Sequence, residues 1–345
     1  MHKTLGWDIG GAHVKAVLLD RDGAVLKVHQ QACPLWMGLD KLEVAILSVL
    51  AHFDVVASQV RHAVTMTGEL VDWFANRHEG VVAIADFVAP LLGGHVLFYC
   101  MNEDADLAHF VALTDVAGQT KMIASANWHA SACLLAQSVP HALVVDVGST
   151  TTDLIVIEHG KVMNRALSDA ARMQQNTLVY TGVVRTPVMA VAQRIPFEKT
   201  MTNVVAEYFA TMADVYRLTT ELPESADLSA TADGQPKTLL DSARRLARMV
   251  GYDCEAQPLE VWQRLAYCFR EKQCQQIQRA ISQYLKGDMI MVGAGVGDFV
   301  VQTIAHGLHQ PYVKFNTLFN HHDDDLAVCL PAYAVAALAV QKGVF

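Results

Sequence analysis

The sequence predicts an α/β fold made of two similar domains. Two distant segments share one layout: an apolar stretch, then Asp-x-Gly, then small or hydroxyl residues, then a second apolar stretch closed by a turn. These segments are residues 5–23, which include Asp8, and residues 143–161, which include Asp146. A chain of 345 residues is long enough for about two domains of ~100–200 residues each, and its 52% hydrophobic residues allow a large core.

The first half begins with a predicted antiparallel meander. Residues 5–9 and 13–19 read as strands around a tight turn at Gly10 and Gly11, and a further turn at residues 22–23 leads into a strand at 24–28. Hydrophobic spacing and turn residues then predict further strands at residues 63–67, 81–88 and 95–99, and helices at residues 39–53, 70–77 and 126–137.

The second half restarts the pattern. Strands are predicted at residues 142–147 and 152–158, with a short strand at 161–164. Later elements are helices at residues 200–216, 236–250, 259–285 (broken near 267–270), 298 onward and 326–341, and strands at 289–292 and 312–316. We predict a first domain of residues 1–138, completed by the C-terminal segment 326–345, and a second domain of residues 139–325.

Composition narrows the classes of function. The net charge is −9 and no cluster of Lys and Arg is visible, so nucleic acid is not an expected partner. The longest apolar run, residues 326–340, is shorter than the ~20 residues of a membrane span and contains Pro331. Seven scattered cysteines without a Cys-x-x-Cys pair predict reduced thiols and a cytoplasmic location, and the N-terminal residues do not resemble a signal peptide.

The first Asp-x-Gly segment predicts a phosphate site. Glycines allow positive φ and close approach of the backbone, and consecutive N–H groups can bind an anion. Asp8 is placed to hold Mg²⁺, partly through water, while Gly10, Gly11 and His13 lie in the turn. The competing interpretation is an ordinary β-hairpin with a glycine turn.

The second segment carries more hydroxyl groups. Asp146 precedes Gly148, Ser149, Thr150 and Thr151, which are poor strand residues but good phosphate ligands. Threonine is common in strands, yet this segment repeats the layout of the first. The pair predicts a phosphate bound from two sides, with Asp8 and Asp146 as the Mg²⁺-facing carboxylates.

A third, glycine-rich segment follows a predicted buried strand. It contains Gly293, Gly295 and Gly297 and offers backbone N–H groups at the start of a helix. The spacing differs from Gly-x-Gly-x-x-Gly, and no opening βαβ unit precedes it, so a dinucleotide-binding fold is disfavoured. The three segments in this order resemble the phosphate-1, phosphate-2 and adenosine motifs of the actin, sugar kinase and heat-shock-chaperone superfamily. That resemblance implies an actin-like fold of two domains around a central cleft.

The segments between these motifs carry a narrower resemblance. They are residues 65–70, 126–128, 178–187, 209–217 and 243–251, and residues 180–187 read Tyr-Thr-Gly-Val-Val-Arg-Thr-Pro. This set resembles the hydantoinase/oxoprolinase-like proteins of tetrahydromethanopterin-linked one-carbon transfer, whose archaeal members include an aryl-ether-forming enzyme of methanofuran biosynthesis. The resemblance covers nearly the whole chain.

The resemblance implies a transferase of methylofuran or methanofuran biosynthesis. An (aminomethyl)furanmethanol diphosphate would lose diphosphate while the phenol oxygen of a tyramine-, γ-glutamyltyramine- or tyrosine-type partner attacks the furfuryl carbon. Mg²⁺ is the expected cofactor, and ATP is possible but not favoured. Glu69 lies where related phosphatases carry a catalytic carboxylate, so it would take the phenol proton or bind the substrate amine; the alternative is an ordinary glutamate at a helix N-terminus. Arg185 would pair with diphosphate or with a substrate carboxylate, or else form a structural ion pair.

Two alternatives stay open at this point. One is an ATP-dependent kinase or hydrolase of the hydantoinase/oxoprolinase class, and the other is a non-enzymatic nucleotide-binding switch. The sequence does not indicate the oligomeric state. We interpret His321, His322 and Asp323 with the two aspartates after them as a solvated loop and helix cap, because adjacent side chains point in different directions.

Overall fold

The computed structural model describes residues 3–102, 107–319 and 324–345. The chain divides into two compact units, each described here by itself. Unit 1 comprises Met1–Ala142, Ile155–Gln175 and Asn316–Phe345, and unit 2 comprises Leu143–Leu154 and Asn176–Phe315. The His-His-Asp segment at residues 321–323 lies outside the described residues.

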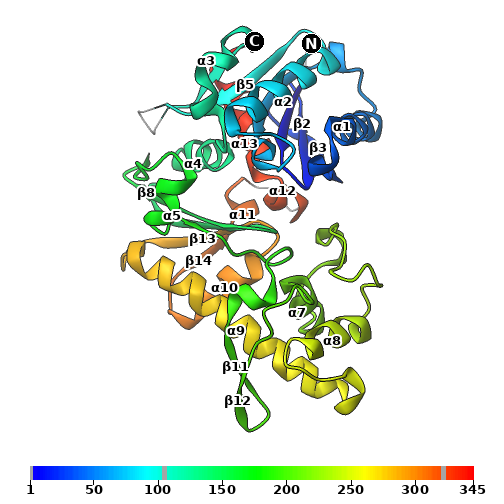
Figure 1. The fold of residues 1–345 in the computed structure, drawn as a ribbon. Helices are drawn as coiled ribbons and strands as arrows, with labels where there is room; N and C mark the ends of the chain where they lie inside the picture. The colour runs from blue at the N-terminus through cyan, green and yellow to red at the C-terminus, as the bar shows by residue number, and fades with distance from the viewer. Residues whose placement is uncertain (1–2, 103–106, 320–323) are drawn as a thin grey trace. The chain divides into compact units, whose positions relative to one another are not determined.

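Unit 1 contains a six-stranded mixed sheet in the order β3-β2-β1-β4-β5-β6 (Figure 1). Strands β1 to β3 form an antiparallel meander, while β4 pairs with β1, and β5 with β4, in parallel. The strands are β1 (Thr4–Ile9), β2 (His13–Leu19), β3 (Val25–Ala32), β4 (Arg61–Met66), β5 (Val96–Cys100) and β6 (His109–Val111).

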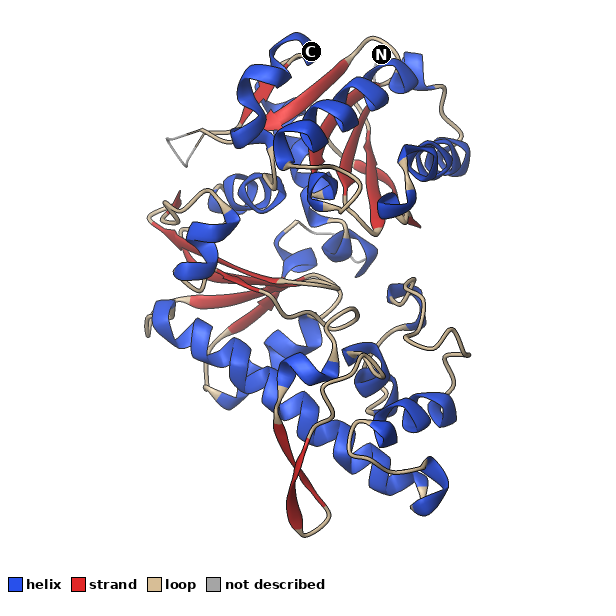
Figure 2. Ribbon diagram, viewed as in Figure 1, coloured by secondary structure: helices blue, strands red, loops and turns tan. Residues whose placement is uncertain are grey.

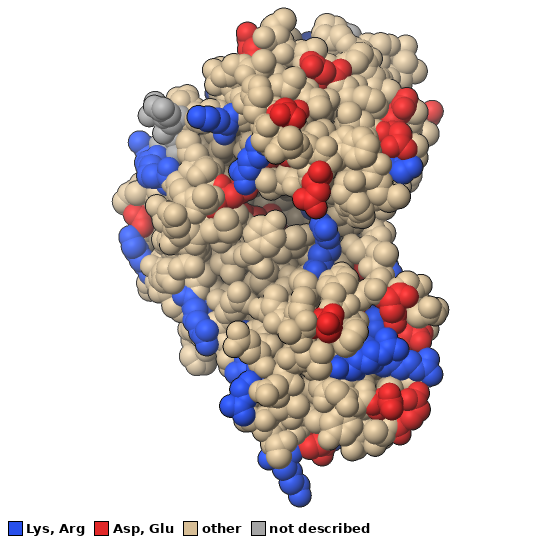
Figure 3. All heavy atoms as spheres, viewed as in Figure 1, with Lys and Arg blue, Asp and Glu red and all other residues tan. Residues whose placement is uncertain are grey.

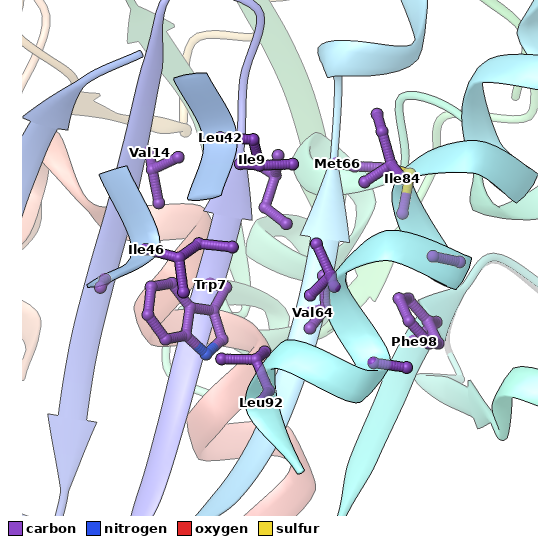
Figure 4. Close-up of a cluster of buried hydrophobic side chains, with 14 of the residues drawn as sticks. Trp7, Ile9, Val14, Leu42, Ile46, Val64, Met66, Ile84, Leu92 and Phe98 are labelled. Atoms are coloured by element: carbon purple, nitrogen blue, oxygen red, sulfur yellow. The ribbon is translucent and has the colours of Figure 1, made fainter. Parts of the chain in front are cut away.

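Successive side chains of β1 point to opposite faces of the sheet. Trp7 and Ile9 face one side, where they join a buried core with Leu42 and Ile46 of one helix and Ile84 of another (Figure 4). Trp7 also donates a hydrogen bond from its indole nitrogen to Nδ1 of buried His62 at 3.0 Å, which satisfies the polar atom that its burial would otherwise leave unpaired.

Gly6 and Asp8 share the other face of β1, which the C-terminal helix covers. A Cβ on Gly6 would lie 2.0 Å from the backbone oxygen of Ala332 and 2.8 Å from the Cβ of Ala336. Only glycine therefore lets this helix lie so close to the strand. The helices of unit 1 are α1 (Leu39–Phe53), α2 (Arg77–Leu92), α3 (Leu113–Ile123), α4 (Asn127–Ala136), α5 (Asp169–Gln174), α12 (Asp324–Val328) and α13 (Leu330–Lys342), with 3-10 turns η1 (Leu35–Met37), η2 (Ala57–Gln59) and η3 (Gly68–Leu70).

Unit 2 is built on a second sheet in the order β10-β8-β7-β13-β14, with β9 also paired to β8. A separate hairpin of β11 and β12 extends from it (Figure 2). The strands are β7 (His141–Val147), β8 (Thr152–Glu158), β9 (Lys161–Val162), β10 (Leu178–Val179), β11 (Arg194–Phe197), β12 (Thr200–Asn203), β13 (Ile290–Ala294) and β14 (Tyr312–Lys314). The helices are α6 (Val188–Val191), α7 (Met212–Leu218), α8 (Leu239–Arg248), α9 (Leu259–Tyr284) and α10 (Asp298–Gly307), with turns η4 (Glu224–Ala226) and η5 (Cys254–Ala256); β14 leads into α11 (Phe315–Leu318).

The two sheets share one topology, which confirms the internal repeat predicted from the sequence. The run β2-β1-β4-β5 of unit 1 corresponds to β8-β7-β13-β14 of unit 2. In both runs a hairpin that contains the Asp-x-Gly segment is extended by two strands that follow later in the chain.

The strand predicted at residues 81–88 and the helix predicted at 70–77 are wrong. Helix α2 begins at Arg77, where Asn76 caps it by accepting a hydrogen bond from the backbone of Glu79 at 2.9 Å. Its buried residues follow helical spacing, and the run of valines and isoleucine misled the prediction because β-branched residues favour strands. Residues 71–76 between η3 and α2 form turns and bends.

In unit 2, the helix predicted at residues 200–216 and the break predicted within the helix at 259–285 are also wrong. Residues 200–216 do not form one helix, because Thr200–Asn203 pairs in a hairpin and α7 starts only after the capping box of Thr211 and Asp214. Helix α9 runs from Leu259 to Tyr284 without the expected break, since Trp262, Leu265 and Phe269 continue one buried face.

Surface charge is mixed on the face shown in Figure 3, where acidic and basic side chains are interspersed. In unit 2, for example, Arg244 pairs with Asp241 at 3.0 Å and Arg264 with Glu198 at 3.4 Å. Within the described ranges, every helix is too short or too polar to cross a membrane.

Candidate functional site

The first Asp-x-Gly loop joins β1 and β2 in unit 1. Asp8 is 5% exposed and lies in register with Lys15 of β2 and Thr65 of β4. The backbone N–H of Gly10 donates to the oxygen of His13 at 2.9 Å and closes the turn. His13 itself is 7% exposed, at the start of β2. This hairpin thus places a carboxylate at the end of a central strand, directly before a tight turn.

Close packing explains the glycines of this loop. We expected them to provide positive φ, but neither Gly10 nor Gly11 has a positive φ, so that expectation is wrong here. A Cβ on Gly11 would lie 2.7 Å from a methyl group of Val71, and a Cβ on Gly68 would lie 3.2 Å from the oxygen of Ile9. The backbone N–H of Thr67 also donates to the Ile9 oxygen at 2.9 Å. The turn that carries Glu69 therefore packs tightly against the first loop.

Glu69 lies in η3, just beyond the end of β4, and is 1% exposed. Burial is the main reason why its pKa rises from 4.5 to about 7, because desolvation disfavours the charged form. Its Oε1 accepts a hydrogen bond from the Ser125 hydroxyl at 2.9 Å, while its Oε2 has no hydrogen-bond partner among the described residues. A Cβ on Gly80 would lie 2.9 Å from the Cβ of Glu69, so α2 approaches this side chain closely.

Ser125 connects Glu69 to a second buried carboxylate. The end of β4 forms an isolated bridge between Met66 and Ala124, which brings the next residue to Glu69. The Ser125 Oγ also lies 3.2 Å from Oδ2 of Asp169, and the same Oδ2 accepts a hydrogen bond from Nη2 of Arg77 at 2.7 Å. Ser125 has a φ of 52°, a left-handed conformation that costs a non-glycine residue roughly 1–3 kcal/mol.

Sequence analysis did not find Ser125, Asp169 or Arg77. Asp169 is the first residue of α5 and is 5% exposed, and its neighbour in the same helix, Arg172, places its guanidinium 4.2 Å above the ring of buried Trp128. An aspartate after the capping residue Ser168 reads as an ordinary helix start, and no local signal in the sequence marks its pairing across the fold.

The second Asp-x-Gly loop joins β7 and β8 in unit 2. Asp146 and the residues from Gly148 to Thr151 are partly exposed, and the N–H of Gly148 donates to the oxygen of Thr151 at 2.8 Å, as in the first loop. The hydroxyls of Ser149 and Thr150 lie 3.4 Å apart. The next hydroxyl, on Thr152, is buried and donates to the oxygen of Thr181 at 2.7 Å, so it has a structural role.

The segment that contains Arg185 lies against this loop. The N–H groups of Val184 and Arg185 both donate to the oxygen of Ser149, at 3.1 and 2.8 Å, and the Arg185 side chain is exposed. A Cβ on Gly182 would lie 2.5 Å from the backbone of Ser149 and Thr150. Arg185 and the second loop therefore form one structural unit.

A buried glutamine of α9 hydrogen-bonds to the segment that precedes Arg185. Nε2 of Gln273 donates to the hydroxyl of Thr181 at 2.8 Å and to the oxygen of Gly182 at 2.9 Å. Its Oε1 accepts from the hydroxyl of Tyr216 at 2.6 Å. Sequence analysis did not predict this role, because one glutamine in a long helix carries no local signal.

The third, glycine-rich segment packs on the second loop. Gly295 has a φ of +79°, and a Cβ on it would lie 2.3 Å from Oδ1 of Asp146. The N–H of Gly297 donates to the oxygen of Val147 at 2.8 Å. A Cβ on Gly293 would instead meet the side chains of Asp298 and Tyr312, which hydrogen-bond to each other.

The structure thus gathers the candidate residues into one set in each unit. Unit 1 brings the first loop next to Glu69; unit 2 brings Asp146, the hydroxyl loop, Arg185 and Gly295 together. Among the described residues, no group of three or more His, Cys, Asp or Glu side chains is arranged to hold a metal ion. Mg²⁺ is commonly held by one or two carboxylates together with water and substrate phosphates, so single aspartates beside N–H and hydroxyl groups fit that donor set.

The chain is similar in sequence to known proteins along most of its length. The family model described as hydantoinase/oxoprolinase matches residues 62–340. The chain is 28% identical over 342 residues to a protein of Methanocaldococcus jannaschii named (4-{4-[2-(gamma-L-glutamylamino)ethyl]phenoxymethyl}furan-2-yl)methanamine synthase, with 97% of this chain and 96% of that protein covered. A protein of the same name from Methanococcus vannielii is 35% identical over 113 residues, which cover 33% of this chain and 50% of that protein.

Solved structures confirm the predicted actin-like α/β fold class. Nucleotide-free acetone carboxylase, from a study of ATP-dependent acetone carboxylation, matches with a TM-score of 0.57 and 11% identity, over 97% of this chain and 70% of that one. Component A of the (R)-2-hydroxyglutaryl-CoA dehydratase of Acidaminococcus fermentans matches with a TM-score of 0.50 and 12% identity, over the full length of both chains. At these identities the similarity concerns the fold alone.

Proposed function

Because the chain belongs to the hydantoinase/oxoprolinase family, we propose that it is the aryl-ether-forming transferase of a methanofuran- or methylofuran-type cofactor pathway. The observation that carries this proposal is the similarity to the Methanocaldococcus jannaschii synthase over 97% of this chain and 96% of that protein. A match of that extent includes both Asp-x-Gly loops and the Glu69 turn, so it is not confined to one shared domain.

The name of the relative describes a product with one ether bond, between a furan methylene group and a phenyl ring. We propose that this bond forms by displacement of diphosphate. The phenol O–H bond breaks, the phenol oxygen supplies the electron pair of the new C–O bond, and the bond from the methylene carbon to the diphosphate oxygen breaks with its electrons. One proton and one diphosphate leave, and no oxidant or reductant is required.

The loops support the leaving-group half of this reaction. The N–H and hydroxyl groups of residues 149–151, with Arg185 beside them, are suited to binding phosphate oxygens. Asp8 in unit 1 and Asp146 in unit 2 are each a candidate carboxylate for Mg²⁺, which when bound would offset the negative charge that builds up on a departing diphosphate. Gly10, Gly11 and His13 would line the first loop, and Gly295 would keep the third segment close to Asp146.

Glu69 supports the proton half. A base works best when its pKa is near the working pH, and burial places the pKa of Glu69 at about 7. Its unpartnered Oε2 is the atom that would accept the phenol proton. If Glu69 instead bound the substrate amine, Glu69→Gln would raise KM and leave kcat nearly unchanged, whereas loss of a base lowers kcat by roughly 10²–10⁴-fold.

The test is an assay of purified protein with synthetic (aminomethyl)furanmethanol diphosphate, Mg²⁺ and γ-glutamyltyramine, tyramine or tyrosine. Ether formation is followed by mass spectrometry, and diphosphate release by a coupled assay. Asp8→Asn and Asp146→Asn should each lower the rate by about 100-fold or more. Asp86→Asn and Asp253→Asn remove the same charge at exposed positions and should leave it unchanged.

Failure has two informative forms. Normal rates in both Asp8→Asn and Asp146→Asn would refute the role of the loops. A protein that makes no ether with any of the three phenols, but hydrolyses or transfers phosphate from ATP, would support the kinase or hydrolase alternative. ATP binding without turnover and without diphosphate binding would support a nucleotide-binding switch.

A further inference from the structure

Glu69 belongs to a hydrogen-bonded chain of four polar side chains, all within unit 1, of which three are buried. The chain runs from Glu69 Oε1 to Ser125 Oγ at 2.9 Å, from there to Asp169 Oδ2 at 3.2 Å, and from the same Oδ2 to Arg77 Nη2 at 2.7 Å. Glu69, Ser125 and Asp169 are each at most 5% exposed, while the Arg77 side chain is 42% exposed. The chain therefore links a buried carboxylate to a charge at the surface.

The number of hydroxyl and carboxyl protons limits which hydrogen bonds these side chains can form at the same time. Ser125 has one hydroxyl proton but faces two carboxylates. If both carboxylates are ionised, they compete for that proton, and two negative charges share a buried site. If Glu69 is protonated, one of the two negative charges is removed and the Ser125 hydroxyl can donate to Asp169, which still accepts from Arg77. The arrangement thus favours a site in which Glu69 carries a proton.

The last two members of the chain, Asp169 and Arg77, act on the pKa of Glu69 in opposite directions. Asp169, from α5, is negative and opposes ionisation of Glu69, whereas Arg77, from α2, is positive and favours it. They are the charged side chains that act on Glu69 from the elements packed around η3. The Ser125 hydroxyl holds Oε1, which leaves Oε2 as the unpartnered and fully buried atom.

The geometry points to Ser125 and Asp169 as positioning residues for Glu69, with Arg77 as the counter-charge that sets how strongly Asp169 acts. Ser125 fixes the carboxylate plane so that Oε2 is presented to the phenol. Asp169 keeps Glu69 ready to hold the proton that it takes. This inference rests on the proposed ether-forming function, in which the phenol proton moves to Glu69.

The test is the pH dependence of kcat/KM, whose acidic limb reports the essential base of the free enzyme. Asp169→Asn should move that limb to lower pH, and Arg77→Gln should move it to higher pH, each by about one unit. Ser125→Ala should lower kcat and also move the acidic limb to higher pH, because Glu69 loses the hydrogen bond that favours its ionised form. Asp86→Asn and Arg21→Gln make the same charge changes at exposed positions and should leave the profile unchanged.

If Asp169 and Arg77 had only a structural role, their variants would not shift the acidic limb of the kcat/KM profile in opposite directions. Equal or absent shifts in Asp169→Asn and Arg77→Gln would overturn the inference. Because Asp169→Asn changes a buried residue, Arg77→Gln at the half-exposed end provides an independent arm if the first variant does not fold.

A measurement without substrate separates this inference from the proposed function. The carboxyl resonances of ¹³C-labelled glutamate can be titrated by NMR, and the Glu69 signal is identified by its loss in Glu69→Gln. If the pKa of Glu69 moves in opposite directions in the two variants but no ether forms, the positioning role stands and the proposed reaction fails. If ether forms but the Glu69 signal does not respond to either variant, the positioning role fails alone.

Discussion

Replacing Glu69 with glutamine should remove a loss of stability that wild type undergoes as the pH rises, while it lowers turnover by roughly 10²–10⁴-fold. The folded protein raises the pKa of Glu69 from 4.5 to about 7, so between these values it binds more protons at this site than the unfolded chain does. Stability from this group is therefore complete below pH 4.5 and is lost as the pH rises through 7. A shift of about 2.5 units corresponds to about 3 kcal/mol.

The measurement is urea unfolding of wild type and Glu69→Gln at several values between pH 4.5 and 8. Wild type alone is not diagnostic, because His62 titrates in an overlapping window with the opposite sign. The difference between the two proteins removes that contribution. The free energy of unfolding of Glu69→Gln, relative to wild type, should increase by about 3 kcal/mol across the window.

The change with pH in the difference between the two unfolding free energies is the test, and the size of that difference at any one pH is not. The new amide would place an N–H₂ group where Oε2 has no partner, a pH-independent cost of roughly 1–3 kcal/mol. Exposed Glu43→Gln should show no such slope. A difference that stays flat from pH 4.5 to 8 would refute the argument, because Glu69 would then not titrate in the range where a base must work.

Two further predictions concern unit 1. Burial lowers the pKa of His62 from 6.5 to about 4, so its contribution to stability is present above pH 6.5 and is lost as the pH falls through 4. In urea unfolding over this range, the free energy of unfolding should fall by about 3 kcal/mol more in wild type than in His62→Gln. Exposed His306→Gln is the control. Gly6→Ala would place a Cβ 2.0 Å from the Ala332 oxygen and should lower the free energy of unfolding by roughly 3 kcal/mol in thermal unfolding, whereas Gly118→Ala, with open space in α3, should not destabilise; an unchanged melting temperature in Gly6→Ala would show that α13 does not pack as described.

The parts of the fold that the sequence predicted are those encoded locally. The β1–β2 and β7–β8 hairpins follow from apolar strands around Asp-x-Gly, and both are present. The strand predicted at residues 81–88 failed because its valines and isoleucine favour a strand locally, while the cap at Asn76 and burial along one face make it helical. Tertiary context outweighed intrinsic preference there.

The candidate site depends even more than the fold on contacts between distant parts of the sequence, which local patterns do not predict. Glu69 was singled out because it lies between a predicted strand and a predicted helix, where related phosphatases carry a catalytic carboxylate, and that position is a local signal. Its partner Ser125 lies 56 residues further along the chain, and Asp169 another 44 residues beyond that. Neither has a motif of its own, so only the folded chain brings them together. The raised pKa of Glu69 is a property of that assembly and not of the segment around it.

The internal repeat allows the turn that carries the proposed base to be compared with its counterpart in unit 2. Strand β4 of unit 1 and strand β13 of unit 2 occupy equivalent positions, each next to the strand that carries the Asp-x-Gly aspartate. Beyond β4 the chain turns through Gly68 to a buried glutamate, whereas beyond β13 it turns through Gly295, which packs on Asp146. The same strand position is therefore followed by the proposed proton acceptor in unit 1 and by closely packed backbone in unit 2. The proposed displacement of diphosphate by a phenol needs only one base, so it does not require a second buried carboxylate beyond β13.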